Sequence, residues 1–207
     1  FKTCYKLMTK SVVNRLIIGI DPGSRLTGYG VIQVVGDDFS FLDAGTIRTE
    51  GSEMPVRIGQ IFAGVKRIVK HYQKYSELPM TAAIEEVFMA QNPDSALKLG
   101  QARGAAIAAL ADCELLVAEY TARQIKQAVC GYGAASKEQV SAMVCRLLNL
   151  TTAPQGDAAD GLACAICHSY NSHSLHKMLG VSRMTSKKKG RWRLSEEDIV
   201  ALNNRRS

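Results

Sequence analysis

The sequence predicts an α/β fold in which helices flank one five-stranded mixed sheet, with three antiparallel strands followed by two parallel ones. Three strand-like segments separated by tight turns occupy residues 16–49, which is typical of an antiparallel meander. Beyond residue 54, helical and strand-like segments alternate, and this alternation favours parallel pairing through crossover helices. The chain has 207 residues, 46% of them hydrophobic, which is enough to build one sizeable core.

The first half of the chain supplies the three antiparallel strands and one helix. Residues 16–20 form a continuous apolar run, as expected for a strand that is buried on both faces, and an Asp-Pro-Gly-Ser turn ends it. Residues 27–35 and 39–49 follow as strands on either side of a Gly-Asp-Asp turn. From residue 58, apolar residues recur at steps of three and four, which predicts an amphipathic helix that ends before Pro79.

The second half supplies two more strands, at residues 81–88 and 115–120. Between them, Asn92 can cap a helix that continues through an alanine-rich stretch. Three further helices are predicted at residues 122–129, after the cap Ser136, and at residues 157–168.

Charge is distributed unevenly along the chain. The net charge is +7, yet residues 181–207 alone carry eight Lys and Arg against three acids. We therefore expect an N-terminal extension at residues 1–14, one domain at residues 15–178 and a basic C-terminal tail at residues 179–207. A basic tail suits a polyanionic partner such as nucleic acid.

The sequence favours a reduced, cytoplasmic protein without a membrane span. Its longest apolar stretches fall short of 18 residues, and the N-terminal residues lack the apolar region of a secretory signal. The six cysteines are then expected to be free thiols. Cys164-Ala-Ile-Cys167-His168 matches the c-type haem attachment pattern, but burial of small side chains in an apolar helix explains it better.

Four acidic residues lie where two strands and a helix could bring them together. Asp21 ends the first strand, Glu85 lies in the fourth, and the last helix carries Asp157 and Asp160 on one face. Crowded carboxylates raise one another's pKa, so such a group is expected mainly where divalent cations neutralise it. The oxygens suit two Mg²⁺ ions about 4 Å apart, with Mn²⁺ as a substitute, which would activate water and stabilise the leaving oxygen of a phosphodiester.

Each acid also fits a purely structural role. Asp before Pro-Gly-Ser is common in turns, and acids in the first turn of a helix gain from its macrodipole. Neighbours on a strand point to opposite faces, so only one of Glu85 and Glu86 can face the site. Residue patterns leave open which one does.

Three segments carry a resemblance to a known family: IGIDPGSRLTGYGVI, IEEVFMAQNPDSALKLGQARGAA and DAADGLACAI. In this order they resemble the RuvC family of Holliday junction resolvases, over roughly residues 16–175. The resemblance implies a ribonuclease H-like fold and a homodimer that nicks four-way DNA junctions symmetrically with Mg²⁺, leaves 5′-phosphate ends and works with a branch-migration helicase. It places the family's carboxylates on Asp21, Glu85, Asp157 and Asp160, and its I-E-x-V-F pattern matches Glu85 rather than Glu86.

The same resemblance places DNA contacts on Phe88, Lys126 and Lys137. An exposed Phe88 ring could stack on an unpaired base, although a core position is equally compatible with the pattern. The two lysines can neutralise phosphate or remain solvated. The cluster at residues 187–193, which includes Trp192, is a candidate for an additional DNA-binding arm.

Two other functions are compatible with parts of the sequence. IGIDPGS followed by Thr-Gly also resembles the phosphate-binding hairpin of sugar kinases and actin-like ATPases. Those proteins need two related lobes, whereas this chain supplies one sheet and no second glycine-rich hairpin. The other alternative is a junction-binding protein without catalysis, and the presence of all four acids argues against it.

Overall fold

The structure is a computed structural model that describes residues 14–86 and 92–179, with side chains up to Ser172. The chain divides into a unit of residues 1–174 and a second unit of residues 175–207, of which only the end of the last helix is described. Phe88, residues 1–13 and the basic cluster at 187–193 lie outside the described residues. The sheet and both of its helical layers belong to the first unit.

The five strands form one mixed sheet, as the sequence predicts. Its order is β3-β2-β1-β4-β5, with antiparallel pairing of β1 to β2 and β2 to β3, and parallel pairing of β1 to β4 and β4 to β5. The strands are β1 (Asn14–Asp21), β2 (Leu26–Val35), β3 (Asp38–Arg48), β4 (Met80–Glu86) and β5 (Val117–Thr121).

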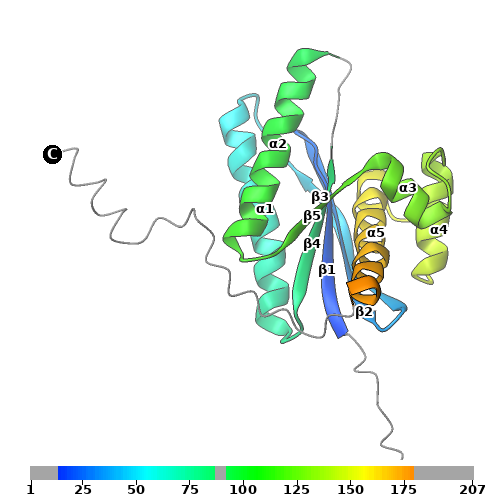
Figure 1. Cartoon of the computed structure of the whole chain (residues 1–207). Helices are drawn as coiled ribbons and strands as arrows, with labels where there is room; N and C mark the ends of the chain where they lie inside the picture. The colour runs from blue at the N-terminus through cyan, green and yellow to red at the C-terminus, as the bar shows by residue number, and fades with distance from the viewer. Residues whose placement is uncertain (1–13, 87–91, 180–207) are drawn as a thin grey trace, which may run out of the picture. The chain divides into compact units, whose positions relative to one another are not determined.

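In the described part of the chain, five helices cover the two faces of this sheet. They are α1 (Met54–Tyr75), α2 (Pro93–Asp112), α3 (Ala122–Cys130), α4 (Lys137–Leu147) and α5 (Gly156–Leu179). Figure 1 shows α1 and α2 on one face, and α3, α4 and α5 on the other. None of the helices in the described part of the chain combines the length and the apolar character that crossing a bilayer requires.

The pleat of β1 separates the core into two clusters. Ile18 and Ile20 pack with the apolar faces of α1 and α2, whereas Ile17 packs with residues of α3, α4 and α5. Successive side chains of a strand point to opposite faces, so a strand covered on both sides is apolar throughout. This arrangement explains the uninterrupted run at the start of the domain.

Two predicted boundaries differ from the structure, one by eleven residues and one by two. The last helix was expected to end at residue 168, but α5 continues to Leu179, since no Gly or Pro interrupts that stretch. The fifth strand was expected from residue 115 and begins at Val117. Before it, Glu114 adopts a left-handed conformation with φ of 61°, as the chain turns out of α2.

Candidate active site

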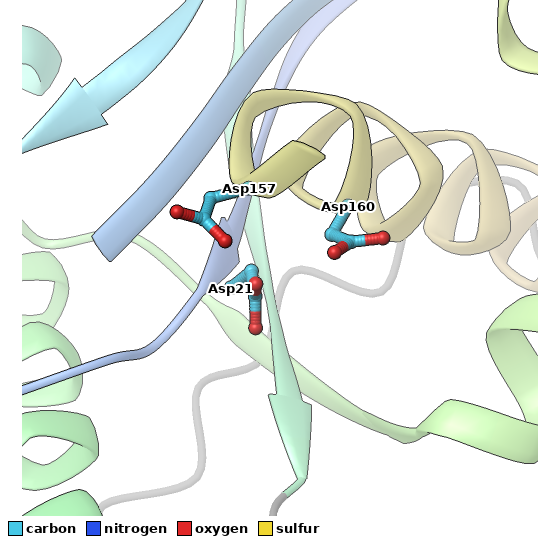
Figure 2. A group of neighbouring side chains, drawn as sticks. All are labelled: Asp21, Asp157 and Asp160. Atoms are coloured by element: carbon cyan, nitrogen blue, oxygen red, sulfur yellow. The ribbon is translucent and has the colours of Figure 1, made fainter. Parts of the chain in front are cut away.

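Three of the four predicted carboxylates gather in one place. Asp21 ends β1, and Asp157 and Asp160 lie in the first two turns of α5. One carboxylate oxygen from each residue lies within 4.8 Å of those from the other two. Figure 2 shows the three side chains between the end of β1 and the start of α5. Segments far apart in the sequence therefore form one acidic cluster.

Glycines on the sheet allow α5 to approach closely enough to form this cluster. A Cβ atom on Gly28 of β2 would overlap the carbonyl group of Asp157, and one on Gly19 of β1 would overlap the backbone of Gly161. No side-chain layer separates the helix from the strands here. The strand pattern alone did not predict this role of Gly28, although a glycine inside a strand commonly marks a close backbone approach.

The pleat of β4 decides between Glu85 and Glu86. Ala83 packs in the cluster beneath α5, while Ile84 packs beneath α1 and α2. Glu85 shares the direction of Ala83, so it faces the α5 side, and Glu86 faces the other. Ile20 of β1 pairs with Ile84, which places Asp21 beside Glu85 at the ends of two parallel strands.

The turn after β1 is held together without the Asp21 carboxylate. Thr27 Oγ1 donates to the Gly23 carbonyl oxygen at 2.8 Å and accepts from the Gly23 amide at 3.4 Å. Within the described residues, Thr27 therefore makes the hydrogen bonds to the turn backbone that a turn aspartate would otherwise make. This observation argues against a purely structural explanation of Asp21.

Two lysines flank the acids around a pocket of about 200 Å³. Lys137 Nζ lies 3.3 Å from Asp160 Oδ2, and Lys126 lines the pocket together with Glu85. Both lysines follow well-capped helix starts, because Thr121 and Ser136 form capping boxes at α3 and α4. The pocket is lined by Asp21, Glu85, Ala122, Ile125, Lys126, Lys137, Val140 and Asp160.

Burial and like charges perturb the acids of this pocket. Burial first, and then the charges of Glu85, Asp160 and Asp157, raise the pKa of Asp21 to about 8. Burial, followed by the charge of Asp160, raises the pKa of Glu85. The carboxylate of Asp160 in turn raises the pKa of Lys137. The cluster therefore concentrates negative charge that only cations or protons can offset.

The residues of the haem-like pattern have structural roles. Cys164 and Cys167 are fully buried free thiols in α5. Tyr120 Oη lies 2.9 Å from His168 Nδ1, and Thr81 Oγ1 lies 3.2 Å from His168 Nε2. Burial lowers the pKa of His168 to about 4. The side chains that would hold a haem are packed inside the domain, so the haem alternative is wrong.

The sheet order and the acidic cluster at the carboxyl end of its central strand define an α/β protein of the ribonuclease H-like class. A family model supports a narrower assignment, because the model described as crossover junction endodeoxyribonuclease RuvC matches residues 17–168. The chain belongs to the RuvC family. The sugar-kinase alternative is therefore wrong.

Similar proteins and structures agree with this assignment. Crossover junction endodeoxyribonuclease RuvC of Psychrobacter sp. (strain PRwf-1) is 65% identical over 90% of this chain and 98% of its own length. The same-named protein of Acinetobacter baylyi is 64% identical over 87% of this chain and 97% of its own length. Thermus thermophilus RuvC, solved in complex with a Holliday junction substrate, has a TM-score of 0.71 and 32% identity, covering 77% of this chain and 96% of that chain.

A more distant neighbour shares the fold alone. The yeast mitochondrial Holliday junction resolvase Ydc2 has a TM-score of 0.51 at 13% identity, covering 81% of this chain and 85% of that chain. This likeness indicates that the same sheet and helices persist when few residues are shared.

Proposed function

We propose that this chain is a divalent-metal-dependent endodeoxyribonuclease that resolves four-way DNA junctions by cutting two opposing strands symmetrically and leaving 5′-phosphate ends. The observation that carries the proposal is the cluster of Asp21, Asp157 and Asp160, with Glu85 on the same pocket, in a member of a family whose relatives are crossover junction endodeoxyribonucleases. Crowded carboxylates beside lysines suit hydrolysis of a phosphodiester.

The donor set fits magnesium. All candidate ligands are carboxylate oxygens, which are the hard donors that Mg²⁺ and Mn²⁺ prefer, and no thiol or imidazole lines the pocket. Two ions per subunit would be held by Asp21, Glu85, Asp157 and Asp160. Two ions are needed if one is to activate the attacking water and the other is to stabilise the leaving oxygen. When bound, such ions lower the pKa of water and stabilise charge on the leaving oxygen.

The chain's own residues would orient the DNA strand around these acids. Lys126 and Lys137 stand at the rim of the pocket, where their ammonium groups can bind the phosphates next to the scissile bond. The apolar wall of Ala122, Ile125 and Val140 limits access of bulk water on that side. Phe88 remains a candidate for base stacking, as the family resemblance predicts, and it lies outside the described residues.

The wider context of the activity also belongs to this proposal. A homodimer would match the two-fold symmetry of a junction, with one strand cut by each subunit. The family resemblance supports cooperation with a branch-migration helicase, and a DNA substrate supports a place in the cytoplasm. The basic tail at residues 179–207 would add phosphate contacts to those of the nuclease domain at residues 15–178. The short extension at residues 1–14 precedes that domain in the sequence.

Cleavage of a synthetic four-way junction, compared with a linear duplex of the same sequence, tests the proposal. We expect Mg²⁺-dependent nicks at symmetric positions in the junction and little cutting of the duplex. The double variant Asp157→Asn and Asp160→Asn should still bind the junction but should not cut it. If this variant cuts at the wild-type rate, the assigned site is wrong. If the wild-type protein binds junctions tightly but never nicks them, the non-catalytic alternative is correct.

A further inference from the structure

Helix α1 has an unusual charge composition for this domain. It contains five Lys and Arg and no Asp or Glu, whereas the other residues between 16 and 180 contain nine Lys and Arg against sixteen acids. The helix thus has a net charge of +5, whereas the rest of this range has nine basic residues minus sixteen acids, a net charge of −7. This helix lies on the α1–α2 face of the sheet, away from the face that carries α5 (Figure 1).

Most of these basic residues form one exposed row. Lys66, Lys70 and Lys74 repeat at four-residue intervals, so they lie on the same side of the helix, with Arg67 alongside. Arg67, Lys70 and Lys74 are exposed, while Ile61, Val65 and Val69 of the opposite side are fully buried. We call Lys66, Arg67, Lys70 and Lys74, together with the exposed His71, the α1 basic row.

Arg57, the remaining basic residue of the helix, has a different environment. It is 5% exposed, and its Nε donates to the Gly51 carbonyl oxygen at 2.9 Å. This contact ties the loop before α1 to the helix. Arg57 therefore has a structural role and is not counted in the α1 basic row.

Little in the described part of the chain neutralises the row. Lys66 Nζ pairs with Asp112 Oδ2 at 2.7 Å, at one end of the row. Arg67 lies near the Tyr29 hydroxyl, which donates to Asp43 at 3.2 Å. Within the described ranges neither Lys70 nor Lys74 forms an ion pair, although the charge of Lys70 also contributes, after that of Lys66, to lowering the pKa of Asp112.

We propose that the α1 basic row binds the sugar–phosphate backbone of duplex DNA outside the pocket where cleavage occurs. Lys66 and Lys74 are separated by about 12 Å along the helix axis, at 1.5 Å per residue. Over that length a DNA strand presents a phosphate about every 3.4 Å of duplex axis, so a short row of cations meets several phosphates at once. The inference rests on the proposed function in one respect, namely that DNA is the polyanion.

The position of the row limits what it can do. The pocket with Asp21 and Glu85 opens on the α5 side of the sheet, and the row lies on the opposite face. It cannot contact the phosphate that is being cut in the pocket of the same subunit. It therefore holds duplex DNA that leaves the cleavage region, and its loss should weaken DNA binding while the rate at saturating junction stays unchanged.

The test compares two double variants that remove the same net charge from different places. Lys70→Gln with Lys74→Gln alters the α1 basic row, and Arg48→Gln with Arg146→Gln alters exposed cations elsewhere. Binding of a linear duplex is measured without metal across a series of salt concentrations, and thermal unfolding confirms that both variants fold. A third variant, Lys70→Arg with Lys74→Arg, keeps the charge and should bind as the wild type does.

We expect the affinity of the Lys70→Gln and Lys74→Gln variant to fall on the order of tenfold or more at 0.1 M salt, and the slope of log affinity against log salt to decrease by about 1.8. The control should change by less than half of this. If the two variants show the same affinity and slope, the proposal is overturned. Junction cleavage with Mg²⁺ is measured separately. A wild-type protein that binds duplex through the row but never cuts junctions would overturn the proposed function and leave this inference standing.

Discussion

Substitution Gly28→Ala tests whether the close approach of α5 to the sheet builds the candidate active site. Gly28 lies in β2, directly across from Asp21 of β1. An added methyl group would overlap the carbonyl group of Asp157 and would lie 3.0 Å from its Cβ. The neighbouring contact is also tight, because a Cβ on Gly30 would lie 2.6 Å from Leu162 Cγ. The helix must therefore move away from the strand.

The size of the effect follows from this overlap. Overpacking of this kind costs about 1–3 kcal/mol of folding free energy, which leaves a typical domain folded. Restoring ordinary contact requires the first turn of α5 to shift by on the order of 1 Å, and Asp157 and Asp160 shift with it relative to Asp21. Because misplacing reactive groups by about 1 Å costs roughly 100-fold in rate, we expect junction cleavage to fall by about that factor.

The assay is single-turnover cleavage of a four-way junction, together with denaturant unfolding of each protein. Gly59→Ala in α1 is the matched control, because a Cβ there meets nothing within 4 Å. Replacing a glycine inside a helix should stabilise the protein by about 0.5–1 kcal/mol and leave cleavage unchanged. If Gly28→Ala cuts at the rate of the wild type, the idea that this close approach sets the carboxylate geometry is refuted.

Three further predictions concern single groups. Glu85→Gln should reduce junction cleavage roughly 10²- to 10³-fold, whereas Glu86→Gln, on the opposite face of β4, should cut normally; equal activities would contradict the assignment. Chelation of metal should stop cleavage, and Mg²⁺ at a hundred times its Kd should add about 2.7 kcal/mol to the unfolding free energy of the wild type but much less to that of Asp21→Asn, as measured by thermal unfolding. Burial lowers the pKa of His168 from 6.5 to about 4 in the folded protein. Between pH 6.5 and pH 4 the unfolded chain therefore binds a proton at His168 that the folded protein does not bind, and the free energy of unfolding falls as the pH decreases. Between pH 7 and pH 5 the loss, measured by denaturant unfolding, should be about 2 kcal/mol larger in the wild type than in His168→Asn.

Local patterns in the sequence predicted the order and type of the elements. The apolar run before Asp21 is typical of a strand covered on both sides, and the three- and four-residue spacing after residue 58 is typical of a helix with one buried face. The caps Ser136 and Asn92 also mark the starts of the helices that they were expected to begin. All of these features depend on neighbouring residues, which is why one sequence was sufficient.

The geometry of the site depends on contacts between distant residues, and sequence patterns left it open. Strand periodicity does not distinguish Glu85 from Glu86, since both follow the same apolar run, and only the family resemblance favoured Glu85. The structure decides through Ala83, which packs under α5 and fixes the direction of every second residue of β4. The ion pair between Lys137 and Asp160 joins residues 23 positions apart, and no local pattern reports such a contact.

One strand links the packing of this domain to its chemistry. Every second residue of β1 faces α5, namely Ile17, Gly19 and Asp21. Ile17 packs in the core, Gly19 allows α5 to approach closely, and Asp21 supplies a carboxylate to the site. A shift of β1 by one residue would move all three to the α1 side and would bury the charge of Asp21 among apolar side chains. Native pairing is therefore favoured by the core and by the acid together. The pairing that buries the apolar residues of β1 is the one that brings Asp21 to Asp157.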